Sequence, residues 1–196
     1  MSDPLLKVRG LKIGATVYPP DAKPHKIKIV HGVDFELQKG KVLGLIGESG
    51  AGKSMTGNAV IGLLTRPAHI KSGEIFLSGQ PIHSLQGDAL RRLRGKRMGM
   101  IFQDPLTSLN PLFTVGEQLV ETIQLHLGLS SSEAQSRAIA LLDRVRIPNP
   151  EERFHQYPHQ FSGGMRQRVV IALALCTCLA MRSNLASPRL LAYSRM

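Results

Sequence analysis

The sequence predicts a domain of the α/β class, in which short apolar strands alternate with amphipathic helices. Apolar residues recur at strand spacing in several short segments and at helical spacing in several longer ones. Glycines and prolines separate these segments, as is typical of turns and loops. The chain has 196 residues, of which 42% are hydrophobic, so it can bury a core of ordinary size.

Five short segments have the character of β-strands. The predicted strands are residues 5–13, 27–37, 42–46, 74–78 and 98–102. The third, Val42 to Ile46, is short, apolar and bounded by glycines, which is typical of a strand buried on both faces of a sheet. Pro19 and Pro20 remove backbone donors, so a loop is predicted between the first two strands.

Four longer segments have the spacing of helices. The predicted helices are residues 53–64, 114–127, 130–145 and 163–179. The second helix carries an apolar stripe along one face, formed by Val115, Leu119, Ile123 and Leu127. Ser131 or Ser132 is predicted to cap the third helix.

The formal charge of +11 at pH 7 invites a nucleic-acid interpretation. The densest basic run, Arg91 to Arg97, lies between apolar segments without accompanying aromatic residues, so we favour a solvent-exposed helix face and expect no nucleic-acid partner. Cys176 and Cys178 are too few to form a structural zinc site, and ordinary thiols are expected. The chain has no run of 18 apolar residues and no apolar signal core, which predicts a cytoplasmic protein.

One segment matches the phosphate-binding loop G-x-x-x-x-G-K-[ST] at every fixed position, between a predicted strand and a predicted helix. Its residues are Gly47, Glu48, Ser49, Gly50, Ala51, Gly52, Lys53 and Ser54. The glycines let the backbone turn tightly and direct N–H groups inward, and the helix N-terminus adds positive potential. Lys53 is expected to reach the β- and γ-phosphates of ATP, and the Ser54 hydroxyl to bind Mg²⁺. The loop alone does not distinguish transporters from kinases, GTPases or helicases.

A second segment resembles the signature sequence of ABC transporter ATPases, usually LSGGQ followed by a basic residue. Its residues are Phe161, Ser162, Gly163, Gly164, Met165, Arg166, Gln167 and Arg168. A serine and two glycines at a helix N-terminus offer a hydroxyl, N–H groups and the helix dipole to a phosphate. Gln103 follows a predicted strand and resembles the glutamine of the family's Q-loop, which contacts Mg²⁺ and the attacking water.

The sequences of residues 102–111 and 157–168 resemble those of the dipeptide and oligopeptide importer ATPases. Nickel and glutathione importers share much of the same sequence. The resemblance covers about residues 5–176. It implies a P-loop NTPase fold of the ABC type, with an N-terminal antiparallel β subdomain and a helical subdomain near residues 104–165. The nucleotide-binding domain would then span residues 1–176. Tyr18 is the candidate for stacking on adenine.

The resemblance also implies partners. In the family, Ser162 to Gln167 would contact ATP held on a second ATP-binding subunit, so a head-to-tail dimer is expected. Two membrane permeases and a periplasmic substrate-binding protein would complete the importer at the cytoplasmic face of the inner membrane. This subunit does not select the substrate, so peptides, nickel and glutathione all stay open.

The chain departs from the family after the signature helix. An apolar strand ending in Asp-Glu is expected there, in which the aspartate orders Mg²⁺ and the glutamate polarises water. No Asp or Glu follows Arg153, and His155 and His159 precede the signature, so neither takes the place of the family's switch histidine. Residues 177–196 are interpreted as an aberrant tail after a frameshift near residues 176–186. We therefore expect a truncated domain that holds Mg-ATP but hydrolyses it poorly.

Two alternative functions belong to other classes of protein. The chain could be a non-catalytic nucleotide-binding remnant of a disrupted transporter gene. It could also be a soluble ABC protein that acts on DNA or ribosomes, which only the basic charge favours. Such proteins usually carry two cassettes or long inserted arms, and the sequence shows neither.

Overall fold

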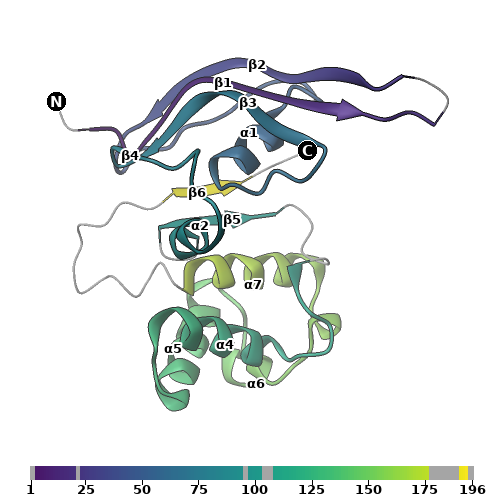
Figure 1. Cartoon of the computed structure of the whole chain (residues 1–196). Coiled ribbons are helices and arrows are strands. Elements are labelled where there is room, and N and C mark those ends of the chain that lie inside the picture. Colours follow the sequence, from purple (N-terminus) through teal and green to yellow (C-terminus); the bar gives the residue numbers. More distant parts are fainter. Residues whose placement is uncertain (1–2, 21–22, 95–96, 103–107, 177–189, 194–196) are drawn as a thin grey trace. The chain divides into compact units, whose positions relative to one another are not determined.

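The computed structural model describes residues 3–20, 23–94, 97–102, 108–176 and 190–193 (Figure 1). The chain divides into two compact units. The first comprises Met1–Arg94 with Pro188–Met196, and the second comprises Gly95–Ser187.

The first unit is built on an antiparallel sheet. Its strands are β1 (Leu6–Val17), β2 (His25–Leu37), β3 (Ala68–Leu77) and β4 (Gln80–Pro81). Their order is β2-β1-β3-β4, so the long strand β1 is central and pairs with both β2 and β3. Leu6 of β1 faces Leu37 of β2 and Leu77 of β3, which places three leucines side by side on the inner face. The sequence periodicity predicted both strands, although β1 continues to Val17 instead of ending at residue 13.

The inner face of this sheet is the core of the first unit. The largest fully buried side chains of the sheet are Val8, Leu11, Ile13, Ile75 and Leu77. Figure 1 shows helix α1 (Lys53–Val60) beside this sheet, and helix α2 (Gly87–Leu93) follows β4 in the chain. The short strand β6 (Leu190–Tyr193) also belongs to this unit.

The second unit is mainly helical. Its elements are β5 (Met98–Ile101), α4 (Val115–Leu127), α5 (Ser131–Arg144), α6 (Pro150–Phe154), the 3-10 helix η1 (Pro158–Gln160) and α7 (Gly163–Cys176). Of the stripe predicted from the sequence, Val115, Leu119 and Ile123 are fully buried and pack with apolar residues of α5 and α7, and Leu127 is partly buried against the same cluster. None of the helices in the described ranges is long and apolar enough to cross a bilayer.

Two helices of the second unit begin with complete capping boxes. The Thr114 hydroxyl accepts from the Glu117 N–H at 3.2 Å, and the Glu117 carboxylate accepts from the Thr114 N–H at 2.7 Å. Ser130 and Glu133 repeat the arrangement at the start of α5. The prediction that Ser131 or Ser132 caps this helix was therefore wrong by one or two residues, because only Ser130 lies three residues before a glutamate.

Residues 42–46 differ most from expectation. They form no strand, and Val42 and Ile46 are 98% and 99% exposed. Within the described ranges, none of the paired strands includes this segment. An apolar run becomes a buried strand only where neighbouring strands supply hydrogen bonds and other elements cover both faces. The composition of the segment indicated a tendency to form a strand, not the presence of those neighbours.

Two further boundaries were also different. The helix predicted over residues 53–64 ends at Val60, where Gly62 takes a φ of 67° and turns the chain away. The strand predicted over 74–78 starts earlier, at Ala68, because its first half pairs with β1. In the basic run, Arg91 and Arg92 are exposed as predicted, whereas Arg94 turns inward and its Nε donates to the Ile61 carbonyl at 2.9 Å.

Candidate nucleotide-binding site

The loop that precedes α1 is shaped by its glycines. Gly50 and Gly52 both have a φ of 83°, in the left-handed region that side chains disfavour. Gly52 is also the N-cap of α1, and an added Cβ there would lie 2.9 Å from Val30 Cγ2 and 3.1 Å from the Ile29 carbonyl oxygen. The loop backbone therefore packs directly on β2, and only glycine fits at position 52.

Lys53 folds back over this loop. Its Nζ donates to the Gly47 carbonyl at 2.8 Å and to the Glu48 carbonyl at 2.7 Å. The ammonium group is thereby held close to the loop backbone, and residues 47–51 around it are exposed to solvent. Ser54 follows in the first turn of α1 and is half-buried. This arrangement concentrates positive charge at an open helix N-terminus, where a phosphate group would be stabilised.

The first turns of the helices show which N-termini are left without an acidic partner. Among the α-helices of the described ranges, α2, α4, α5 and α6 carry Asp or Glu in the first turn. Only α1 and α7 carry none, and they place Lys53 and Arg166 there instead. A cation at a helix N-terminus is electrostatically unfavourable unless an anion joins it. Both exceptions are the helices that begin in the predicted phosphate-contacting motifs.

The start of α7, where the predicted signature segment lies, is fixed by local hydrogen bonds. The Ser162 hydroxyl accepts from the Met165 N–H at 3.3 Å, and Arg166 Nε donates to the Phe161 carbonyl at 2.9 Å. Phe161 is 2% exposed and anchors the turn, whereas Gly163 and Gly164 are exposed with open space where a Cβ would lie. The helix N-terminus is thus held rigidly and left accessible.

The predicted site residues belong to both units of the chain. The loop at 47–54 belongs to the first unit, and the segment at 162–167 belongs to the second. Tyr18, the candidate for stacking on adenine, lies just after β1 and is 73% exposed. Gln103 lies outside the described residues.

The family model described as ABC transporter matches residues 30–181, which is most of the chain. The chain belongs to the ABC transporter family. An antiparallel sheet and a set of helices are present as expected for an ABC-type fold, and the family match confirms the predicted family.

Several curated members of the ABC transporter family are similar to this chain. It is 46% identical over 172 residues to the oligopeptide transport ATP-binding protein of Bacillus subtilis strain 168, covering 87% of this chain and 47% of that protein. It is 44% identical over 174 residues to the protein of the same description from Escherichia coli strain K12, covering 89% and 50%. The chain therefore spans about half the length of the curated relatives it matches.

Solved structures of ABC cassettes share the fold. A dimeric ATP-binding cassette in a post-hydrolysis state, bound to ADP and phosphate, superposes with a TM-score of 0.76 at 22% identity, covering 97% of this chain and 88% of that one. A dimeric bacterial ABC transporter cassette superposes with a TM-score of 0.74 at 25% identity, covering 88% and 70%.

One structural residue of this ABC domain was missed by sequence reasoning. Arg94 also donates from Nη2 to the Gly62 carbonyl, so its guanidinium caps the C-terminal end of the helix that carries Lys53. Arg94 lies within a basic run, and the sequence around it does not distinguish it from the exposed Arg91 and Arg92. Only the fold shows which arginine of the run turns inward.

Proposed function

We propose that this chain binds Mg-ATP at residues 47–54 and is the ATP-binding, energy-coupling subunit of an ABC importer. The observation that carries the proposal is the pair of helix N-termini that lack acidic residues and begin in the two phosphate-contacting motifs. In the described ranges, every other α-helix supplies its own negative charge at this position. At the N-termini of α1 and α7, a bound ligand would supply the negative charge.

The roles follow from the chemistry of each group. The backbone N–H groups around Gly50 and Gly52 would cradle the phosphates, and Lys53 would exchange its carbonyl partners for phosphate oxygens. The Ser54 hydroxyl would bind Mg²⁺, which neutralises phosphate charge when bound. Gln103 would orient water near the metal, and Tyr18 would stack on adenine.

The remaining roles concern a second subunit. Ser162 to Gln167 would contact the nucleotide of a second ATP-binding subunit, which completes a head-to-tail dimer. Closure of this dimer on ATP would drive two permeases that receive substrate from a periplasmic binding protein. The dimer would lie at the cytoplasmic face of the inner membrane. The names of the relatives favour peptides over nickel or glutathione as the transported substrate.

Nucleotide binding is the first test. Lys53→Ala should weaken binding of a fluorescent ATP analogue with Mg²⁺ by at least about tenfold, since it removes the charge-assisted contact to the phosphates. Lys41→Ala removes an exposed lysine outside the motif and should leave affinity unchanged. Equal affinity of Lys53→Ala and the unmodified protein would refute the assignment of the site.

We further propose that the 196-residue polypeptide binds ATP without hydrolysing it efficiently. Its sequence has no Asp or Glu after Arg153 to take the roles of the Asp-Glu pair. The measurement is phosphate release at saturating Mg-ATP, compared with an intact importer ATPase. A rate close to that of the intact enzyme would contradict the proposal, and tight binding with negligible turnover would support it. The second outcome would also favour the non-catalytic remnant over an active subunit.

A further inference from the structure

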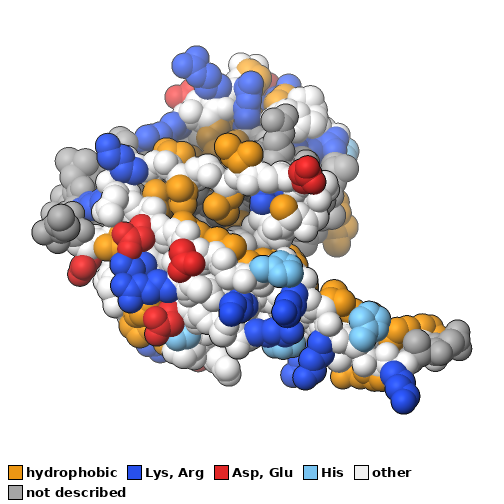
Figure 2. Space-filling view, turned by 90° about the horizontal axis from the view of Figure 1, so that it is seen from above, with side chains coloured by type: hydrophobic (Ala, Val, Ile, Leu, Met, Phe, Trp, Pro, Cys, Tyr) orange, Lys and Arg blue, Asp and Glu red, His pale blue; other side chains and the backbone are white. Residues whose placement is uncertain are grey.

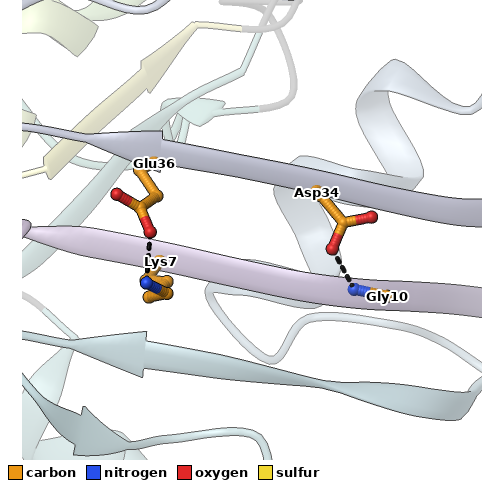
Figure 3. A network of polar contacts seen from close by, with 4 residues as sticks. All are labelled: Lys7, Gly10, Asp34 and Glu36. Atoms are coloured by element: carbon orange, nitrogen blue, oxygen red, sulfur yellow. Dashed lines mark hydrogen bonds and ion pairs between the residues drawn. The ribbon is translucent and has the colours of Figure 1, made fainter.

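The outer face of the β1–β2–β3 sheet is divided by charge. Near the start of β1 the charges are balanced: Lys7 forms an ion pair with Glu36, and Asp34 Oδ1 accepts from the Gly10 N–H at 2.8 Å (Figure 3). Arg9 of β1 faces Glu74 of β3 across the same face. Each cation in this half therefore has an acidic neighbour.

The other half of the same face carries lysines and histidines, and no Asp or Glu among the described residues. In the β1–β2 register, Lys12 faces His31, Gly14 faces Lys28 and Thr16 faces Lys26, while Ile13 and Ala15 between them are buried on the inner face. All the charged side chains of this half are exposed. We call this half the lysine face and define it by Lys12, Lys26, Lys28, His31, His69 and Lys71.

Lys71 of β3 also lies on the lysine face. A Cβ added to Gly14 would lie 2.2 Å from Lys71 Cε, so the aliphatic stem of Lys71 crosses the outer surface of β1 at that glycine. Lys12 similarly lies over the neighbouring strand, with its Cε 3.5 Å from where a Cβ on Gly32 would be. The stems pack on the sheet and leave the ammonium groups in solvent. Figure 2 shows Lys, Arg and His side chains along the projecting arm of the hairpin.

Gly14, over which the Lys71 stem lies, faces Lys28 and is on the same face as Lys12, so lysines of three strands lie near one another. Repulsion between these like charges is unfavourable, and none of the described residues in this half is acidic. A polyanionic partner would remove that repulsion. The face has no Arg, Phe, Tyr or Trp, so it lacks the fork geometry that reads bases and the rings on which bases stack. Exposed lysines spread over three strands fit a laterally mobile array of negative charges instead.

We propose that the lysine face attracts the anionic headgroups of a phospholipid bilayer and holds the ABC domain against its surface. The inference goes beyond the proposed function, since it concerns a face of the sheet opposite to the buried one and does not depend on nucleotide. Attraction of this kind is electrostatic and reversible, and it weakens as salt shortens the screening length. The lysine face therefore acts as an orienting contact and not as an anchor.

Co-sedimentation of the full 196-residue protein with lipid vesicles tests the proposal. The protein should partition onto vesicles that contain phosphatidylglycerol at low salt, and not onto phosphatidylcholine vesicles. Lys26→Gln, Lys28→Gln and Lys71→Gln together should lower partitioning by roughly 100-fold, while glutamine keeps most of each aliphatic stem. ATP affinity should not change, so a failure here is distinguishable from a failure of the nucleotide site.

The matched control removes the same charge elsewhere. Lys41→Gln, Arg92→Gln and Arg144→Gln are exposed and lie outside the lysine face, so this triple variant should keep most of the partitioning. Circular dichroism establishes that both variants fold. Equal losses in the two variants would overturn the proposal, because net charge alone would then explain binding. Tighter binding to duplex DNA than to vesicles at equal charge would overturn it in favour of a nucleic-acid surface.

Discussion

At the scale of single residues, the glycines of the phosphate-binding loop have two separable roles. Gly50 and Gly52 share the same φ of 83°, yet only Gly52 lies against another strand. Around Gly50 no atom lies within 4 Å of an added Cβ, whereas at Gly52 Val30 and the Ile29 carbonyl leave no room. The sequence motif assigns both positions to glycine without saying why, and the structure distinguishes conformational freedom from close packing.

Alanine substitutions measure the difference. Gly50→Ala should lower the free energy of unfolding by about 1 kcal/mol, the cost of a side chain in the left-handed region. Gly52→Ala adds overpacking against β2 and should cost about 3 kcal/mol in total. Denaturant unfolding monitored by circular dichroism gives both values. Equal losses for the two variants would show that the contact with Val30 does not constrain the loop.

At the scale of elements, the helices of the second unit are fixed by local chemistry that the sequence displays. Thr114 and Ser130 each precede a glutamate by three residues, and both capping boxes form. The apolar stripe of α4 was predicted from its helical spacing, and three of its four residues are fully buried while Leu127 is partly buried. Segment 42–46 was not predictable in this way, because strand formation there depends on neighbours distant in the sequence. Arg94 was missed because its partners are 32 and 33 residues away.

The capping boxes make the helical unit sensitive to acid. The Thr114 backbone N–H, and then its hydroxyl, lower the pKa of Glu117 from 4.5. The Ser130 hydroxyl, and then its backbone N–H, lower the pKa of Glu133. A lowered pKa means that the unfolded chain binds protons first, so this stabilisation is complete above about pH 5 and is lost as the pH falls through the lowered values.

Glu117→Gln with Glu133→Gln removes both titrating groups. The double variant should unfold at a lower temperature than the unmodified protein at pH 7, and the difference should shrink on acidification below pH 4.5. Thermal unfolding followed at several pH values measures it. Glu121→Gln, on the same helix outside the capping boxes, is the control and should leave the pH dependence unchanged. A constant difference at every pH would contradict the assignment.

At the scale of the whole molecule, the most consequential surface is the apolar segment at residues 42–46. Val42 and Ile46 are almost fully exposed and lie in extended or irregular backbone without strand partners in the described ranges. Exposed apolar residues on unpaired backbone favour pairing with another copy of the same segment. The same segment leads directly into the phosphate-binding loop, so association there would compete with nucleotide access.

Polar substitution should relieve this tendency. Val42→Thr with Ile46→Thr is expected to reduce concentration-dependent association, measured by light scattering, and to change the free energy of unfolding by no more than about 0.5 kcal/mol. Leu125→Thr removes a comparable aliphatic side chain, 77% exposed on α4, where the backbone is already hydrogen-bonded within the helix. That control should associate like the unmodified protein. A similar reduction by both variants would assign association to general surface hydrophobicity.

The two hydrogen bonds from Lys53 to the carbonyls of Gly47 and Glu48 bear on the kinetics of ligand capture. A lysine side chain that is already immobilised forfeits little rotational entropy when an anion arrives. If a phosphate binds as proposed, its oxygens would replace these two carbonyls around an ammonium group that stays in place. Little conformational search would then be needed after the encounter.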